Sequence, residues 1–489
     1  MRNGMMRVVA GALAAGAMMS LTATATPPLT IVFKNSSGLA DNQVYIGFLG
    51  SSEIAATNVQ TGAPIQQTAF GDTHWYTLDQ LPQGISLTSF SGRVYIGYGE
   101  PWVFLNAGYE PSPSSNVDPN YLKRWDKVEF TYRGNQADVA DVTSIDYYGI
   151  RTGVKVFKNG TSGTLVKELK DATTQQALDA LATLTTPANA AVVLNGSDFV
   201  RILGPSVLPD SPPSPYPTFQ AYLSFLQSTY QPAHGGKIAR IEGHFAGTSD
   251  PITPEKQAQN YGFDAILSPS LDLTLSGSGD LIGSHDIHIT AAELNKPTGI
   301  YGANPAFQID QGDPIKAPND IYGWILGDLL AGFNIGAIGS TVVVNGTEVG
   351  EIKSQQWFTL TEMFTALQPS HPGFYNAWAN AMAPISDAYN FAYSDRFAPV
   401  VAPLDPAKVD TMEIDIGDAA APSNCPCDLN HDGVVDDSDF VIFVGAYNLL
   451  DCTDPTMPAG CPSDFNGDHL VDDADFVIFV PAYNDYVCP

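Results

Sequence analysis

The first 150 residues alternate short apolar runs with turn-forming residues. Four runs rich in β-branched and aromatic side chains, at 29–33, 44–48, 93–97 and 127–132, are separated by clusters of Gly, Asn, Ser and Pro. Short runs at such spacing predict the β-strands of a sandwich or barrel.

Beyond about residue 160 the spacing of apolar residues becomes helical in places. It predicts a helix at 165–184, with cap-type residues at 171–174, and another at 217–230, where Pro217 can open the first turn. Further helices are expected at 321–332, 357–367 and 374–383, and strands at 237–244, 271–275 and 409–416. The pattern therefore predicts a mainly β protein with an α/β part inserted at about 160–395, in a unit that spans residues 27–418.

The composition changes abruptly near the C-terminus. After a linker of small residues at 419–424, the segment from Asn424 to the end holds thirteen Asp and no Glu, Lys or Arg. We interpret residues 425–489 as a separate small domain. All five cysteines lie within it, so one thiol must remain unpaired, and the sequence does not fix the disulfide pairing.

This domain contains a repeat with a period of 36 residues, in which an acidic loop precedes Phe-Val-Ile-Phe-Val. Alternate residues of a tight loop can all point inward and supply the six to eight oxygens that Ca²⁺ requires. A disordered acidic tail would not repeat in register. The expected ligands are Asp428, Asn430, Asp432, Val434, Asp436 and Asp439 in the first loop, and Asp464, Asn466, Asp468, Leu470, Asp472 and Asp475 in the second.

Loop position 6, where the turn is sharpest, differs between the two copies. Gly433 occupies it in the first loop and His469 in the second. A side chain costs strain there, so the second site should bind Ca²⁺ more weakly.

The N-terminus and the charge balance narrow the class of protein. A basic start, a short apolar stretch and a small-residue site near Ala25 predict a signal peptide at 1–25 and a secreted or cell-surface protein, since the apolar stretch is too short for a membrane anchor. The formal net charge of −30 disfavours nucleic acid and anionic lipid as partners. No later stretch is long and apolar enough to span a membrane.

Two acids near the end of the strand-rich region are candidates for catalysis. Glu129 lies on the predicted strand 127–132, on the face opposite Val128, and a turn near 134–140 can fold the next strand back so that Asp146 lies about 5–8 Å from Glu129. Glycoside hydrolysis uses two carboxyl groups. A surface Glu paired with Arg133 and a turn acid at 146 are the alternatives.

The segments Asp-Lys-Val-Glu-Phe-Thr-Tyr at 126–132, Val-Thr-Ser-Ile-Asp-Tyr-Tyr-Gly-Ile at 142–150 and Tyr-Asn-Phe-Ala-Tyr-Ser-Asp-Arg-Phe at 389–397 resemble those of glycoside hydrolase family 64, the thaumatin-like endo-β-1,3-glucanases. The resemblance covers about residues 29–418. It implies a β-sandwich or barrel joined to a smaller α/β domain, with a groove for β-1,3-glucan between them.

Carried onto this sequence, the resemblance implies that Glu129 is the general acid and Asp146 the base of an inverting endo-β-1,3-glucanase that needs no cofactor for catalysis. It implies that Glu129 is held protonated and Asp146 ionised. Thr131, Arg133 and Asp395 would contact substrate, and Trp125 could offer its ring to a sugar, although a place in the core is the commoner fate of such aromatics. Arg133 stands where the family usually has Asn, and Ser394-Asp395 replaces a pair of acids.

The paired acidic loops resemble a type I dockerin, in which each calcium loop is followed by one helix. The resemblance implies two Ca²⁺ sites, a small α-helical module and a possible cohesin-bearing partner protein. Propensity alone favours a strand for Val-Ile-Phe-Val, and Pro481 should interrupt the second helix. Two alternatives to the hydrolase stay open: a non-catalytic thaumatin-like β-glucan-binding protein, and a dockerin-bearing structural envelope protein.

Overall fold

The computed structural model describes residues 26–50, 54–66, 74–103, 105, 109–196, 198–316, 318–397, 400–417, 427–429, 435–458 and 461–485. The predicted signal peptide at 1–25 and the linker at 419–424 lie outside these residues, as do positions 430–434 of the first acidic loop. No helix in the described ranges is long and apolar enough to cross a membrane.

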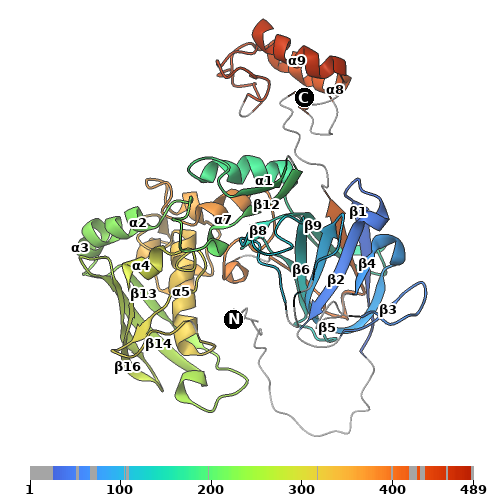
Figure 1. Ribbon diagram of the computed structural model, residues 1–489. Coiled ribbons are helices and arrows are strands. Elements are labelled where there is room, and N and C mark those ends of the chain that lie inside the picture. Colours follow the sequence, from blue (N-terminus) through green and yellow to red (C-terminus); the bar gives the residue numbers. More distant parts are fainter. Residues whose placement is uncertain are drawn as a thin grey trace.

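An 11-stranded sheet forms the first lobe (Figure 1). Its main path is β10-β9-β21-β1-β5-β6-β7-β20, with β2, β3 and β4 attached beside β5. Because β20 also lies against β9 and β10, the two ends of the path approach each other and the sheet is a nearly closed barrel. The strands are β1 (Leu29–Ser36), β2 (Val44–Gly50), β3 (Ala55–Asn58), β4 (Trp75–Thr77), β5 (Ile85–Tyr98), β6 (Trp125–Tyr132), β7 (Val139–Val142), β9 (Arg151–Lys158), β10 (Thr164–Leu169), β20 (Val401–Pro403) and β21 (Thr411–Gly417).

Residue alternation places the core inside this barrel. On β6, Val128, Phe130 and Tyr132 are buried, whereas Glu129 and Thr131 on the opposite face are partly exposed, as the sequence predicted. Strand β21 lies inside the sheet, where it runs parallel to β1 and antiparallel to β9. The N-terminal strands are thus completed by a strand from almost 400 residues later in the chain.

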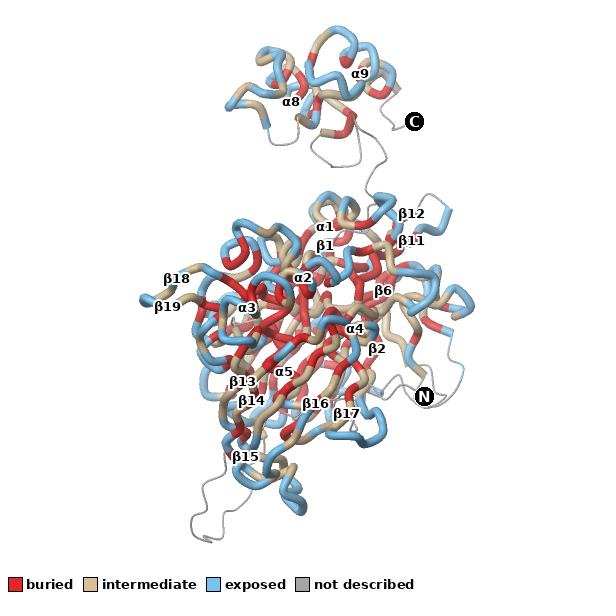
Figure 2. Tube along the Cα trace, turned by 90° about the vertical axis from the view of Figure 1, so that its left-hand side faces the viewer, coloured by how far each residue is buried: buried red, intermediate tan, exposed pale blue. Residues whose placement is uncertain are grey.

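The chain between β10 and β20 builds a second lobe around a five-stranded antiparallel sheet. In spatial order its strands are β13 (Ala239–Phe245), β14 (Gln259–Leu267), β15 (Leu273–Gly279), β16 (Gly283–Ile289) and β17 (Gln308–Ile309). Helix α5 (Ile321–Ile335) packs on one face of this sheet, on the side toward the first lobe (Figures 1 and 2). Asp320 caps its first turn and Gly336 ends it in the left-handed conformation, so both helix ends are satisfied.

Short elements surround this sheet. They are α2 (Gln220–Phe225), which continues into a π-helical turn at Leu226–Tyr230, α3 (Gln231–Ala233), α4 (Ala291–Asn295), α6 (Ser354–Trp357), and the two-stranded β18 (Val343–Val344) and β19 (Thr347–Glu348). Their apolar side chains join α5 and the inner sheet face in one core.

A third, aromatic core joins the two lobes. It is built under the small sheet β11-β12-β8 (Val192–Asn195, Asp198–Leu203, Tyr147–Tyr148) and the helices α1 (Thr174–Leu181) and α7 (Ala377–Met382). Arg201 is fully buried there. Its guanidinium lies 4.8 Å from the Trp125 ring centroid and donates to the carbonyls of Tyr121 and Lys123, which compensates the burial of its charge.

The C-terminal segment has its own small core between α8 (Asp437–Tyr447) and α9 (Asp473–Asp485), with Phe443 and Phe479 stacked 5.1 Å apart. Buried residues are sparse in this module compared with the two lobes (Figure 2). Cys452 and Cys461 form a disulfide, while Cys427 is a free, buried thiol. Cys425 and Cys488 lie outside the described residues.

Several predicted elements differ from the structure. The first part of the helix expected at 165–184 is strand β10, because Leu165 and Lys167 extend the hairpin with β9, and the helix begins only after the cap at Thr173. The helix expected at 357–367 is replaced by short turns. Val-Ile-Phe-Val is helical in both repeats, so the strand that propensity favoured is wrong. The expected interruption at Pro481 is also wrong, since α9 continues through it.

Candidate active site

Glu129 lies at the centre of a row of charged residues that crosses three neighbouring strands. The register of the sheet places it opposite Arg93 on β5 and opposite Asp141 on β7. Its side chain is 43% exposed, so it can reach a bound molecule, and its Oε2 lies 3.0 Å from Nε of Arg93. Arg93, Glu129 and Asp141 are therefore aligned on one outward face of the barrel.

Arg93 is shared between two acids. Besides Glu129 it contacts the carboxylate of Glu110, which also accepts a hydrogen bond from the Tyr95 hydroxyl. Burial alone would favour the protonated form of Glu110, but the charges of Arg93 and Lys127 and these hydrogen bonds outweigh it and lower the pKa of Glu110. The site thus holds one carboxylate firmly ionised behind Arg93.

Asp141 behaves in the opposite way. Burial, followed by the negative charge of Glu129, raises the pKa of Asp141 well above its ordinary value; Lys127 and Arg93 oppose this shift, and Asp395 adds to it. Asp141 therefore retains its proton at a pH where an isolated carboxyl group has lost its own.

The predicted position of Asp146 beside Glu129 in a simple hairpin is wrong. The turn after β6 fixes a register in which Glu129 faces Asp141, and β7 already ends at Val142. Asp146 lies in a bend instead, where its side chain accepts a hydrogen bond of 3.0 Å from Ser206 Oγ. The chain then returns to the start of β6, where Tyr147 receives a 3.1 Å hydrogen bond from Lys127 Nζ.

Of the residues predicted to contact substrate, some lie on the accessible face near Glu129 and one is buried in the core. Thr131 is on the same face of β6 as Glu129, and its hydroxyl lies 2.8 Å from that of Ser91. The side chain of Arg133 is exposed just beyond the strand. Trp125 is only 2% exposed and packs edge-on against Tyr147, so the expectation that it stacks on a sugar is wrong.

Asp395 is brought to the cluster from the far end of the sequence. It is exposed in a short 3-10 turn (Ser394–Arg396), and its charge acts on Asp141. The next residue, Arg396, forms a salt bridge with the buried Asp328 of α5 and lies 4.1 Å from the Trp324 ring centroid. The second lobe therefore anchors the turn that presents Asp395 to the first lobe.

Sequence reasoning missed Arg93 and Asp141. Arg93 is the first residue of the predicted strand at 93–97, and Asp141 directly precedes the segment 142–150. The signal that could have found Asp141 is the turn at residues 133–138: Asp138 accepts hydrogen bonds from the backbone N–H groups of Arg133 and Asn135, which sets the hairpin register.

The second acidic loop of the C-terminal module is closed by its last acid. Asp475, fully buried, accepts hydrogen bonds of 2.7 Å and 3.1 Å from the backbone N–H groups of Phe465 and Asn466, and Asp464 accepts three from Gly467, Asp468 and His469. The acids at positions 1 and 12 therefore close on the same short loop. His469 has φ +71°, the left-handed conformation expected at position 6.

No three acidic, His or Cys side chains in the described ranges converge on a point that could hold a metal ion. In the second loop the carboxylates instead bond to the loop's own amides. The donor set of this loop, with oxygens at positions 1, 3, 5, 9 and 12, fits a hard cation such as Ca²⁺. Of the first loop, Asn430, Asp432 and Val434 lie outside the described residues, while Asp428 and Asp439 are buried and Asp436 caps α8.

Residues 28–237 match the model of the family Glyco_hydro_64, described as Beta-1,3-glucanase. The match covers less than half of the chain, and over these residues the chain is similar to family 64 β-1,3-glucanases. The matched segment contains Arg93, Glu129, Asp141 and Asp146, and the match confirms the predicted enzyme class, an endo-β-1,3-glucanase. Among curated proteins, none matches the chain.

Solved structures of β-1,3-glucanases are also similar to the chain, at low identity. A laminaripentaose-producing β-1,3-glucanase in complex with laminaritetraose is 17% identical, with 81% of this chain and 99% of that chain covered and a TM-score of 0.49. A family 64 β-1,3-glucanase domain from Clostridium beijerinckii is 16% identical (80% and 98% covered, TM-score 0.47). The family 64 enzyme from Paenibacillus barengoltzii complexed with laminarihexaose is 12% identical (80% and 75% covered, TM-score 0.42).

Proposed function

We propose that this protein is a secreted endo-β-1,3-glucanase that inverts the anomeric carbon, with Glu129 as the general acid and Asp146 as the base. The single observation that supports this most is the position of Glu129. It is half exposed on the outward face of a strand, inside the matched segment and opposite Asp141, whose pKa is raised by burial and by the charge of Glu129. Strand positions hold a catalytic side chain more firmly than loop positions.

The reaction needs a proton for the departing sugar oxygen and a water activated on the other side of the ring. Glu129 is the exposed member of the facing Glu129–Asp141 pair and would donate this proton. The side chain of Asp146, oriented by Ser206, is the acceptor for a proton of the attacking water. An inverting enzyme holds its two carboxyls roughly 6.5–9.5 Å apart, so that the water fits between Asp146 and the sugar.

The remaining polar residues position the chain of sugars. Thr131 and Ser91 offer hydroxyls beside Glu129, Asp395 approaches from the second lobe, and Arg133 extends from the end of β6. Together they can donate to and accept from the hydroxyl groups of a neutral glucan.

The decisive experiment is Glu129→Gln in the full-length protein, assayed by release of reducing ends from laminarin or curdlan. Removing a general acid should lower kcat by about 10²–10⁴-fold. Glu168→Gln is the matched control, because Glu168 is an ion-paired strand acid on the same lobe, with its carboxylate 3.4 Å from Lys155 Nζ. Full activity of Glu129→Gln with an unchanged melting temperature would contradict the assignment. Proton NMR of the first product formed should show the α-anomer if the configuration is inverted.

One observation favours a second candidate, a β-glucan-binding protein without turnover. The carboxylate of Glu129 is engaged in a salt bridge with Arg93, whereas a general acid must be available to the departing sugar oxygen. Binding of the wild-type protein to insoluble β-1,3-glucan without any release of reducing ends would support this alternative.

For the C-terminal module we propose a dockerin-like Ca²⁺-binding function. Its support is the repeated loop-helix unit and the closure of the second loop by Asp475. Asp464, Asn466, Asp468, Asp472 and the carbonyl of Leu470 would hold the ion with Asp475, and the ion would supply the positive charge that the module lacks. Exposed apolar residues on its helices, including Val441 (69%) and Val477 (69%), offer a surface for a cohesin-bearing protein. Capture of a cohesin in Ca²⁺ but not in EDTA would test this.

A further inference from the structure

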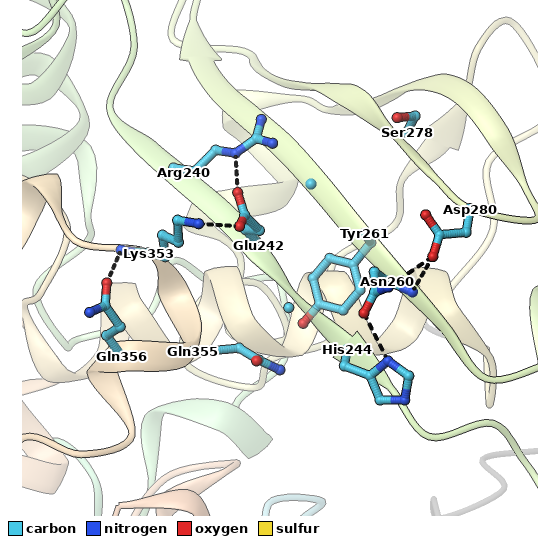
Figure 3. Close-up of a pocket in the computed structure, with 12 residues that line it drawn as sticks. Arg240, Glu242, His244, Asn260, Tyr261, Ser278, Asp280, Lys353, Gln355 and Gln356 are labelled. Atoms are coloured by element: carbon cyan, nitrogen blue, oxygen red, sulfur yellow. Dashed lines mark hydrogen bonds and ion pairs between the residues drawn. The ribbon is translucent and has the colours of Figure 1, made fainter.

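A pocket of about 550 Å³ lies on the second lobe (Figure 3). It opens at the edge of the five-stranded sheet, where β13 borders the turn and helix at residues 353–356. Neither Glu129, Asp141 nor Asp146 lines it. Ligand sites commonly have volumes of about 300–1,000 Å³, so this pocket is large enough for more than a water cluster.

The pocket lies at the edge of the sheet, and its charged residues on β13 point away from α5. On β13, Ala239 and Ile241 are buried toward α5, whereas Arg240, Glu242 and His244 alternate with them and point outward into the pocket. None of the residues that line the pocket belongs to the Glu129 cluster. The pocket is therefore distinct from the candidate active site.

Its charged side chains balance one another. Arg240 donates to Glu242 at 3.1 Å, Lys353 also contacts Glu242, and Asp280 accepts from the Asn260 amide at 2.9 Å. Two cations and two carboxylates leave no net charge, on a chain whose formal net charge is −30. Such a site attracts a metal ion or a phosphate only weakly, and suits a neutral polar ligand.

Several polar groups around the pocket retain hydrogen-bonding capacity. Within the described part of the chain, the side chains of Gln355 and Ser278 form no hydrogen bond, and both are exposed. His244 uses Nδ1 for Asn260, at 3.0 Å, and leaves Nε2 free. Amide, hydroxyl and imidazole groups both donate and accept, which is the capacity that the hydroxyl groups of a sugar require.

A glycine on each face of the sheet leaves room for one of the side chains that line the pocket. A Cβ at Gly262 would lie 2.3 Å from the Arg240 guanidinium, and a Cβ at Gly243 would lie 2.3 Å from the Gln355 amide. Each planar side chain can thus lie flat across a glycine backbone. Flat, bidentate groups of this kind match pairs of hydroxyls on neighbouring carbons of a sugar ring.

We propose that this pocket is a second saccharide-binding site, which takes a short stretch of β-1,3-glucan through His244, Gln355 and Ser278. The choice of glucan rests on the proposed function. The site holds the polysaccharide at a point remote from the Glu129 cluster, so it contributes to binding and not to the chemical step. Two points of attachment on one rigid molecule raise the apparent affinity for a long chain more than for a short one.

The test is a binding experiment on the full-length Glu129→Gln protein, which keeps the ligand intact. A β-1,3-linked glucohexaose is titrated calorimetrically, and the double variant His244→Ala, Gln355→Ala is compared with Gln60→Ala, which removes an exposed glutamine from a turn of the first lobe. We expect two binding events, one of which weakens by about tenfold or more in the double variant as its hydrogen bonds are lost. Gln60→Ala should leave both unchanged.

A second readout separates this proposal from the proposed function. In the active protein, the double variant should lower the rate on insoluble glucan while hydrolysis of the soluble hexaose keeps its kcat. A single binding event that the double variant leaves unchanged, or an unchanged adsorption to insoluble β-1,3-glucan, would overturn the pocket assignment. Absence of hydrolysis would overturn only the assignment of Glu129.

Discussion

The molecule contains two groups of carboxylates, which differ in where their compensating positive charge comes from. On the barrel, Glu129, Glu110 and Asp141 face Arg93 and Lys127, so the fold supplies the positive charge. In the C-terminal module thirteen Asp lie in a segment without any Lys or Arg, and the described carboxylates bond to backbone amides. The charges of the first group are compensated by cations of the protein itself, whereas the segment that holds the second group contains no Lys or Arg.

This difference bears on function. Acids compensated by fixed cations can have their pKa values set apart from each other, which is what acid–base chemistry needs. Acids gathered without a cation repel each other until one is bound, which links their folding to an external ion. The same residue type therefore points to catalysis in one region and to metal binding in the other.

The largest effect is expected when Ca²⁺ is removed from the C-terminal module. Removing Ca²⁺ with EDTA should unfold it, because the gain from ion binding is part of its folding free energy. Limited proteolysis of the full-length protein should then cut within residues 435–485 while the two lobes resist. Cleavage at the same rate in EDTA and in Ca²⁺ would show that the module needs no cation.

The two loops can be separated by mutation. Asp475→Asn should reduce the Ca²⁺ stoichiometry measured by calorimetry from two to one, since it removes the acid that closes the second loop. Asp451→Asn is the control, because Asp451 is an exposed acid outside both loops that accepts from Thr453. Because of His469 at position 6, the site lost should be the weaker one.

A smaller effect is expected from Arg93→Gln on the barrel. Arg93 opposes the raised pKa of Asp141, so its removal should raise that pKa further and move the pH–activity profile to higher pH. Arg151→Gln removes a cation from the same lobe, 3.5 Å from Asp415, and should leave the profile in place. An identical profile for Arg93→Gln would separate Arg93 from the acid pair.

The smallest effect is expected from Asp171, an acid with neither cation nor metal. Burial raises the pKa of Asp171 to about 7, against the hydrogen bond from Ser386. Its ordinary pKa in an unfolded chain is about 3.9, so the native state gains stability from the bound proton below about pH 4 and loses it as pH rises through about 7.

Asp171→Asn should remove this dependence, so that the stability of the variant relative to the wild type rises by about 2–3 kcal/mol between pH 5 and pH 8. Denaturant unfolding at both pH values measures it. Asp179→Asn on the exposed side of α1 is the control. A constant difference between wild type and variant across this range would mean that Asp171 does not titrate there.

Much of the barrel could be predicted because its strands carry their own signal. The runs at 29–33, 44–48, 93–97 and 127–132 are strands β1, β2, β5 and β6, and the outward face of Glu129 followed from alternation. The strand at 164–169 was mistaken for a helix because its apolar spacing fits both, and its pairing with β9 decided the outcome. The Val-Ile-Phe-Val segments form helices α8 and α9 despite their β-propensity, because packing of Phe443 on Phe479 buries the apolar faces of these helices.

The sequence by itself determined which residues could do chemistry: the acids of the first lobe, the repeated acidic loops, and the segment matched by the glucanase family. It could not determine which acids meet, because that depends on hairpin register and on contacts across hundreds of residues. The tertiary structure placed Asp141 opposite Glu129, brought Arg93 to their side, and carried Asp395 into range through the Arg396–Asp328 salt bridge. Residue type is a local property, whereas the electrostatic environment that sets a pKa is created only when the chain has folded.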